Sequence, residues 1–343
     1  MVTIKDVAHD AGVAVGTVSK VLNGQYVKDA NRIKVEKSIR KLGYQMNFYA
    51  KGLKSKSTHT VAAIVPDIVD PFFAAWVYHI EQALYKNGYK MILCNTQGTI
   101  EKEEDYFRMA EQNKVDGIIC VTYRDAEPYV SESIPVISLD RHFEKKVSCI
   151  CSDNYRGGQL AAEQMIRTGS TSLLYMRTGA PIEGETMKRG EGFLDYCRKH
   201  KVPCEVLDLG EDFEPLGNDN SSIDEALRSF LVSWRRSGRM RYDGIYTSTD
   251  LLASILLRQM RILGISVPEE VQIIGHDGII PMKRGGYVVS TIVQPIEKMA
   301  EKSVELLIKK IRGEEIDVLT VLPVKFVHGG TTRVYNNNSK NTV

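Results

Sequence analysis

The stretch TIKDVAHDAGVAVGTVSKVLNG, residues 3–24, decides how the first part of the chain folds. Thr3 can act as an N-cap for a short amphipathic helix, and Gly12 stands where a left-handed residue ends a helix and begins a tight turn. A second short helix is predicted from Val15 to Leu22, so the pair has the outline of a helix-turn-helix. The first helix is predicted because its apolar residues are three and four positions apart: Ile4, Val7, Ala8 and Ala11.

A third helix is predicted over residues 29–42, with Ile33, Ile39 and Leu42 facing inward. Helices this short need one another to form a stable core in water. Residues 1–58 hold eleven basic and four acidic side chains, a net charge of +7, whereas the remaining residues hold 34 basic and 39 acidic ones. A basic head on an acidic body favours a polyanionic partner for the head, such as DNA. A small helical bundle without a DNA role is the alternative.

Two segments of this head, Thr3-Ile-Lys-Asp-Val-Ala-His-Asp-Ala-Gly-Val13 and Thr17-Val-Ser-Lys-Val-Leu-Asn23, resemble the opening of the lactose-repressor (LacI/GalR) family of bacterial transcriptional regulators. The resemblance implies that the second helix enters the major groove of operator DNA. Phosphate contacts fix the register there, and base contacts read the sequence. The resemblance implies that Val15, Gly16 and Lys20 contact base edges and that Thr17, Ser19 and Asn23 contact phosphates. It also implies that Thr3 is a DNA-binding residue.

The same positions suit this role chemically. Lys20 can donate to guanine O6 and N7, and Val15 can contact a thymine methyl group. The sequence departs from the family pattern at Ala14, where a serine N-cap is usual, and at Gly16, which has no side chain to read a base.

The segment Asn47-Phe-Tyr-Ala-Lys-Gly-Leu-Lys-Ser55 resembles the family's hinge helix, which folds on DNA when two subunits pair. The resemblance implies that Leu53 wedges into the minor groove, with Asn47 and Ala50 as further DNA-binding residues. A flexible tether is the alternative. Met46 replaces the proline that is usual in this region.

From Thr60 onward, apolar runs alternate with helical stretches. Runs such as Val61-Ala-Ala-Ile-Val65 are apolar without alternation, which is typical of parallel strands covered on both faces. About 270 residues of this pattern exceed one compact α/β unit, so two doubly wound lobes are expected. The expected strands are 61–65, 90–94, 117–121, 135–139, 172–176, 205–209, 244–247 and 271–274, and the expected helices are 71–87, 101–113, 189–199, 223–235, 251–263 and 296–312.

Further segments resemble the family's effector domain, which is similar to periplasmic sugar-binding proteins, so the resemblance covers nearly the whole chain. The family fold implies three crossings between the lobes, near Gly158, Ser290–Val293 and Asp317–Thr320. The matching segments are Asp70-Pro-Phe-Phe73, Asp140-Arg141, Ser152-Asp-Asn-Tyr-Arg-Gly-Gly158, Arg189-Gly-Glu-Gly-Phe193, Thr249-Asp250, Gly275-His-Asp277 and Thr291-Ile-Val-Gln-Pro295.

The expected fold class is an all-α helix-turn-helix head plus an α/β body of two doubly wound parallel-sheet lobes, like a periplasmic binding protein. The head takes residues 1–46 and the hinge and linker take 47–59. The effector-binding and dimerisation body takes 60–335, and a polar, disordered tail takes 336–343. Lobe 1 is expected over 60–158 and 293–318, and lobe 2 over 159–292 and 319–335.

The resemblance places an effector in the cleft between the lobes, where the matched residues follow expected strands. Aromatic rings can stack on a sugar face, and charged side chains can bind hydroxyl groups. Packing of Phe72 and Phe73 in the core and capping of a helix by Asp250 are the alternatives. The candidate effector-binding residues are Phe72, Phe73, Arg141, Arg189, Tyr246, Asp250 and Asp277, with Asp140 lining the same cleft.

Rival classes find less support in the sequence. It has no Walker-type loop, His-Glu-x-x-His or Gly-x-Ser-x-Gly motif, so catalysis is not expected. A secreted sugar-binding protein would need a signal peptide and has no use for a basic head. No membrane span or signal core is found, which indicates a cytoplasmic protein. The six cysteines are expected to be mostly buried reduced thiols, and no cofactor or metal is predicted.

The expected function is therefore a repressor that binds a pseudo-palindromic operator as a homodimer, because one helix-turn-helix covers only a half-site. Its effector is expected to be a sugar or sugar derivative, since Arg141 fits the sugar-responsive members of the family. A corepressor, either a purine-like molecule or a phosphorylated carrier protein, is the alternative.

Overall fold

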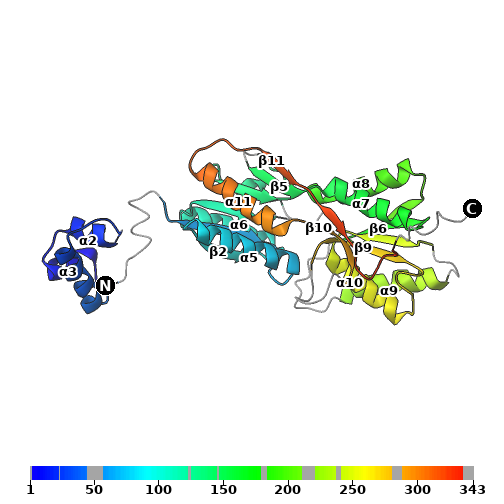
Figure 1. Ribbon diagram of the computed structural model, residues 1–343, viewed down its shortest axis with the longest axis horizontal. Coiled ribbons are helices and arrows are strands. Elements are labelled where there is room, and N and C mark those ends of the chain that lie inside the picture. The colour runs from blue at the N-terminus through cyan, green and yellow to red at the C-terminus, as the bar shows by residue number, and fades with distance from the viewer. Residues whose placement is uncertain are drawn as a thin grey trace, which may run out of the picture. The chain divides into compact units, whose positions relative to one another are not determined.

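The computed structural model describes residues 2–22, 24–44, 57–122, 125–144, 147–178, 184–210, 221–236, 241–279 and 288–334. The chain forms two compact units, Met1–Thr58 and His59–Val343 (Figure 1). Within the described ranges, no helix is long and apolar enough to cross a membrane.

The described residues of the head form three helices, α1 (Ile4–Ala11), α2 (Val15–Leu22) and α3 (Asp29–Leu42), which confirms the three helices predicted from the sequence. Thr3 caps α1: its Oγ1 accepts from the Asp6 amide, and the Asp6 carboxylate accepts from the Thr3 amide at 2.8 Å. This reciprocal pair is a capping box. Gly12, at φ 62°, ends α1 in the left-handed conformation. The helices share a core of Val7, Ala8, Ala11, Val18 and Val35.

One predicted core residue of the head is wrong. Ile33 is 63% exposed, whereas Val35 and Ser38 are buried and Ile39 and Leu42 pack against the core. Residues two apart on a helix point about 200° apart, so the side of α3 that buries Val35 leaves Ile33 in solvent. The inward stripe of α3 therefore begins at Val35.

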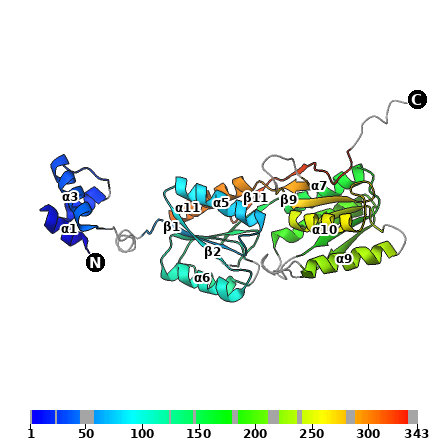
Figure 2. The same ribbon diagram turned by 90° about the horizontal axis from the view of Figure 1, so that it is seen from below.

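The first lobe of the body is a six-stranded sheet in the order β11-β5-β4-β3-β1-β2, and every neighbouring pair is parallel. Helices α5 (Pro71–Lys86) and α11 (Ile296–Ile311) cover one face and α6 (Ile100–Gln112) covers the other (Figure 2). Both faces are therefore buried, as the unbroken apolar runs predicted. The strands are β1 (Thr60–Val65), β2 (Lys90–Asn95), β3 (Gly117–Cys120), β4 (Val136–Leu139), β5 (Ser148–Ser152) and β11 (Leu319–Leu322).

The second lobe is also a six-stranded sheet, in the order β12-β10-β9-β8-β6-β7, and its edge strand β12 runs antiparallel to β10. Helices α9 (Ser221–Arg236) and α10 (Asp250–Ile262) pack on one face, and α7 (Asn154–Arg167) and α8 (Lys188–Lys199) pack on the other. The strands are β6 (Leu173–Arg177), β7 (Cys204–Asp208), β8 (Gly244–Thr247), β9 (Gln272–Asp277), β10 (Ser290–Val293) and β12 (Lys325–Val327). Two short 3-10 turns, η1 (Glu127–Tyr129) and η2 (Glu185–Met187), complete the described elements.

The chain crosses between the lobes three times, and the crossings correct the expected lobe boundaries. The first lies at Asp153 rather than near Gly158, because all of α7 packs on the second lobe. The second follows Val293, which still pairs with Asp277 of β9. The third lies at residues 323–324 rather than near 317–320, because β11 pairs with β5 in the first sheet.

Elements that the sequence did not predict include β5, α7, β10, β11 and β12. All five residues of β5 are buried although its sequence, Ser-Cys-Ile-Cys-Ser, begins and ends with serine.

The six cysteines are free, and five of them are buried while Cys204 is half-buried. That confirms the expectation of mostly buried reduced thiols.

Helices α7 and α8 approach so closely that glycine is required at their contact. A Cβ on Gly158 would lie 2.0 Å from the Arg189 carbonyl oxygen, and one on Gly192 would lie 2.0 Å from the Tyr155 carbonyl oxygen.

We expect Gly158→Ala to lower the free energy of unfolding by about 3 kcal/mol, because backbone atoms cannot yield as a flexible side chain can. Urea unfolding followed by circular dichroism measures the loss. Arg156→Ala, exposed on the same helix, is the control and should change stability by less than about 1 kcal/mol. Equal stabilities for the two variants would contradict the close packing.

Candidate functional site

The outward side of α2 carries the residues expected to read DNA bases. Val15 is 42% exposed, and Gly16 and Lys20 are exposed, whereas Val18 on the opposite side has no exposed surface. The first turn closes on the backbone of Ala14, whose carbonyl oxygen accepts from the Thr17 amide at 2.8 Å. The helix therefore forms without the usual serine cap.

Three further residues predicted to contact DNA lie on α2 or at the start of α1. Thr17 and Ser19 are half-buried on α2. The Thr3 hydroxyl donates to the Asp6 carboxylate at 2.8 Å as part of the α1 cap. The remaining predicted DNA contacts, Asn23, Asn47, Ala50 and Leu53, lie outside the described residues.

A polar contact between α1 and α3 holds the head together. The buried Ser38 hydroxyl lies within hydrogen-bond distance of the Val7 carbonyl oxygen (3.2 Å) and of Asp10 Oδ2 (2.8 Å). Lys41 Nζ lies 2.6 Å from Asp10 Oδ1, and hydrogen bonds from Lys41 and Ser38 lower the pKa of Asp10 below its ordinary value. This contact joins α1 to α3, the two helices with which α2 shares its core.

In the body, a buried guanidinium lies where residues from several strand ends meet. Arg189, on α8, is only 5% exposed. Its Nε donates to Asn154 Oδ1 at 2.7 Å and its Nη1 donates to the Ser248 carbonyl oxygen at 2.6 Å. Asp277 Oδ1 lies 3.6 Å from the same Nη1. Asn154 follows β5 of the first sheet, whereas Ser248 and Asp277 lie at the carboxyl ends of β8 and β9 of the second.

The two candidate carboxylates of the second lobe are held by the chain itself. Asp250 accepts from the Thr291 hydroxyl at 2.6 Å and from the Gly278 and Ile279 amides at 2.8 Å each. Burial raises the pKa of Asp250 to about 7. The alternative role of Asp250 as a helix cap is taken by Thr249, whose hydroxyl accepts from the Leu252 amide.

Asp277 ends β9 in a left-handed conformation, at φ 117°, that a non-glycine residue rarely adopts. Its Oδ1 accepts from Gln294 Nε2 at 2.8 Å, on the second crossing between the lobes. Burial raises the pKa of Asp277 well above its ordinary value, although Arg189 opposes the shift. A strained backbone kept at this position is typical of functional sites.

The first lobe contributes Asp140 and Arg141, directly after β4. Asp140 accepts from Asn154 Nδ2 at 3.3 Å, and burial raises its pKa to about 6. Arg141 donates to Thr122 Oγ1 at 3.0 Å, and its guanidinium lies 4.9 Å from the centre of the Phe143 ring. Asn154 therefore joins Asp140 of the first lobe to Arg189 of the second.

The three aromatic candidates are placed in the cores of the lobes. Phe72 and Phe73, in the first turn of α5, pack with Trp76 in the core of the first lobe, and their contact with the effector stays a prediction. Tyr246 has no exposed surface, and its hydroxyl lies 2.7 Å from His276 Nδ1. Its ring lies 5.0 Å from that of Phe193. β8 turns this side chain inward toward α8, and its expected contact with the effector stays a prediction.

Sequence reasoning did not select Asn154, Glu185 or Gln294, although all three are buried polar residues of this region. Asn154 and Gln294 lie within segments that resemble the family, and each directly follows or precedes a crossing between lobes. Glu185 has no such signal, since its partners in the first lobe are distant in sequence.

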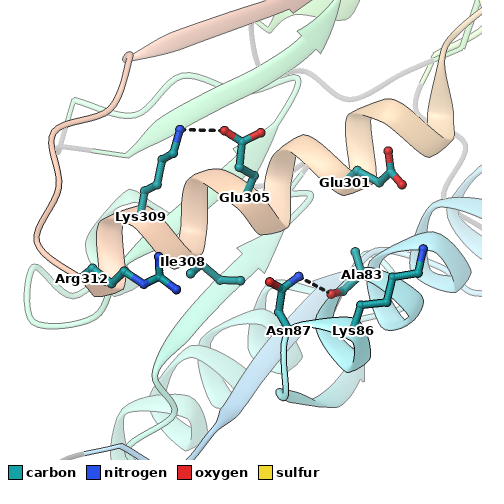
Figure 3. A pocket seen from close by; sticks show the side chains of 8 residues that line it. All are labelled: Ala83, Lys86, Asn87, Glu301, Glu305, Ile308, Lys309 and Arg312. Carbon is teal, nitrogen blue, oxygen red and sulfur yellow. Dashed lines mark hydrogen bonds and ion pairs between the residues drawn. The ribbon is translucent and has the colours of Figure 1, made fainter.

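A pocket of about 310 Å³ lies elsewhere on the first lobe, between α5 and α11 (Figure 3). Glu305 and Lys309 pair across one turn of α11 at 2.7 Å, and Asn87 Nδ2 donates to the Ala83 carbonyl oxygen at 2.8 Å. Because three basic and two acidic side chains line it, the pocket does not match a ligand of one charge. It is lined by Ala83, Lys86, Asn87, Glu301, Glu305, Ile308, Lys309 and Arg312.

Both parts of the chain match known families. Residues 3–47 match the family described as bacterial regulatory proteins, lacI family. Residues 58–279 match the family described as periplasmic binding proteins and sugar binding domain of LacI family.

Full-length relatives and a solved structure agree with these matches. The sucrose operon repressor of Pediococcus pentosaceus is 32% identical, over 96% of this chain and 98% of that protein. The ribose operon repressor of Halalkalibacterium halodurans is 33% identical, over 97% of this chain and 98% of that protein. A periplasmic binding protein/LacI transcriptional regulator from Alkaliphilus metalliredigens, crystallised with D-xylulofuranose, is 31% identical with a TM-score of 0.69, over 80% of this chain and 100% of that chain.

The raised pKa of Asp140 gives this region a measurable pH dependence. The folded chain holds a proton on Asp140 up to about pH 6, whereas the unfolded chain releases it near its ordinary pKa. The free energy of unfolding therefore falls as the pH rises through this window. Relative to Asp140→Asn, the wild type should lose about 2 kcal/mol between pH 4 and pH 7. Urea unfolding of both proteins across this range tests it, and parallel pH profiles would show that Asp140 is not buried as described.

Proposed function

The chain belongs to the LacI family of bacterial regulatory proteins, and on this premise we propose that it is a repressor whose operator affinity is set by a small carbohydrate bound between the lobes of its body. As a member of that family it is a DNA-binding transcriptional regulator with a ligand-binding domain. The observation that carries the carbohydrate proposal is the buried Arg189, surrounded by hydrogen-bonding groups from the strand ends.

The chemistry of that region suits a ligand rich in hydroxyl groups. A hydroxyl both donates and accepts, so it can bind a guanidinium and a carboxylate at once. Arg189 and Asp277 are 3.6 Å apart, beyond hydrogen-bond distance, so a hydroxyl near both can add bonds that the pair lacks. Arg141 and Asp140 are the proposed contacts from the first lobe. The names of the sucrose and ribose operon repressors and the D-xylulofuranose complex support the same ligand class.

We further propose that the ligand acts by binding one arrangement of the lobes better than another, because only differential affinity shifts a conformational equilibrium. The three crossings, at 153, 294–295 and 323–324, are the points about which the lobes would move. Two copies of the head would read the two half-sites of a pseudo-palindromic operator, in the cytoplasm, with Leu53 as the minor-groove wedge. The carbohydrate would be bound without being chemically changed.

The base-reading role of α2 is tested at Lys20. Selection of bound sequences from a random DNA pool supplies an operator, and fluorescence anisotropy at fixed salt gives specific and non-specific affinities. Lys20→Ala should weaken operator binding at least tenfold, about 1–3 kcal/mol for a lost bidentate base contact, with a smaller loss on random DNA. The control Lys34→Ala, exposed on α3, should not change the preferred sequence. If Lys20→Ala selects the same operator with the same affinity, Lys20 reads no base.

The effector proposal is tested by thermal shift and calorimetry with sucrose, D-ribose, D-xylulose, hypoxanthine and guanine. At least one sugar should stabilise the wild type, and Arg189→Gln should lose more than about thirtyfold in affinity for it, because a buried charge-assisted bond is worth 2–5 kcal/mol to a complex. Arg156→Gln, on the exposed side of α7, is the control and should bind as the wild type does. Stabilisation by a purine alone would replace the sugar proposal by the corepressor alternative.

A further inference from the structure

A buried carboxylate of the second lobe is bound mainly by the first lobe. Glu185, in η2, is 3% exposed. Its amide donates to the Asp140 carbonyl oxygen at 2.9 Å, and its Oε1 lies 2.6 Å from His142 Nε2. Its Oε2 accepts from the Cys151 thiol at 3.6 Å. Asp140, His142 and Cys151 all belong to the first lobe.

The backbone around this contact is also close. A Cβ on Gly184 would lie 2.9 Å from the Asp140 carbonyl oxygen, so the η2 segment lies directly against the end of β4. The remaining partner of Glu185 is in its own lobe: Lys188 Nζ lies 2.7 Å from Oε1. Through its amide and its carboxylate, Glu185 thus contacts three residues of the first lobe and, in its own lobe, Lys188.

Glu185 stays ionised in this setting. Burial acts to raise its pKa, but hydrogen bonds from Lys188 and His142 outweigh burial and hold the pKa below its ordinary value. A carboxylate removed from water is stable only while such partners surround it. Two of its side-chain partners, His142 and Cys151, are lost if the lobes separate, and water must then replace them.

The contact of Glu185 differs from the link that Asn154 makes between the lobes. Asn154, which joins Asp140 to Arg189, directly follows the first crossing and can move little when the lobes move. Glu185 lies more than thirty residues beyond that crossing, so its contact reports the separation of the lobes themselves.

We propose that Glu185 is a latch between the lobes: a positioning residue that does not touch the effector but stabilises the present arrangement, in which Asn154 joins the proposed effector contacts Asp140 and Arg189, and so adds to effector affinity. The proposal rests on the proposed function only for the effect on the effector. A ligand that binds between the lobes binds more weakly when a smaller fraction of the protein has the competent arrangement.

The latch is tested on the full chain with Glu185→Gln, His142→Ala and the double variant. Hydrogen exchange is read by mass spectrometry on peptides covering 184–192 and 138–143. It measures the protection of the Glu185 amide by its hydrogen bond to the Asp140 carbonyl oxygen, and it needs no ligand. We expect exchange of the Glu185 amide to be about tenfold faster in either single variant, and no faster again in the double variant, because both changes break one contact. Glu191→Gln, exposed on α8, is the matched control and should exchange as the wild type does.

Calorimetry with D-ribose and sucrose as probes gives the effect on binding. Whichever sugar binds the wild type should bind Glu185→Gln and His142→Ala about tenfold more weakly. Unchanged exchange, or additive effects in the double variant, would overturn the latch. Weaker sugar binding with unchanged exchange would make Glu185 a direct ligand contact and overturn it too. If no sugar binds the wild type, the proposed effector fails while the exchange result still decides the latch.

Discussion

A guanidinium in a protein interior must be surrounded by acceptors, because an unpaired buried charge is costly. Arg189 has this requirement. Its acceptors are the side-chain amide of Asn154, which follows the first sheet, and the Ser248 carbonyl oxygen at a strand end of the second. The Asp277 carboxylate, at another strand end of the second sheet, lies close to the guanidinium. Aspartates that would ionise in water are kept close to it in a dry environment, which is why their pKa values rise. The strained backbone of Asp277 and the carbonyl that Glu185 binds belong to the same region, so the interface between lobes is organised around one positive charge.

Much of this could be predicted from the sequence where a pattern is local and repeated. The head helices follow from apolar spacing and two glycine stops, and the strands of the body follow from unbroken apolar runs. Arg189, Asp250 and Asp277 were selected as candidates because each lies in a segment that resembles the family, and the structure brings them together. Their roles as ligand contacts remain proposals. The resemblance to the family indicated which segments form this region. The structure added which of their polar groups already have hydrogen-bond partners within the chain.

The remainder depended on contacts that no local pattern contains. The strand β5 is not predicted because its two serines interrupt the apolar pattern, although the sheet buries them. Residues 319–322 were placed in the second lobe, but they form β11 beside β5 of the first, since a strand's partner in a sheet is not visible in its own residues. Ile33 was expected to face inward with Ile39 and Leu42, but the buried stripe of α3 starts two residues later, at Val35. Tyr246 lies on the side of β8 that faces the core, a direction that its own sequence neighbours do not give.

The three crossings between the lobes also determine the order in which the chain can acquire its structure during synthesis. The head is contiguous, so it can fold as soon as it leaves the ribosome. Neither lobe is contiguous: the first needs α11 and β11, and the second needs β12. Both sheets therefore wait with an incomplete edge until residues 319–327 emerge, and then close almost together. A nascent chain of this protein would carry a finished DNA-reading head well before it carries anything that could sense a ligand.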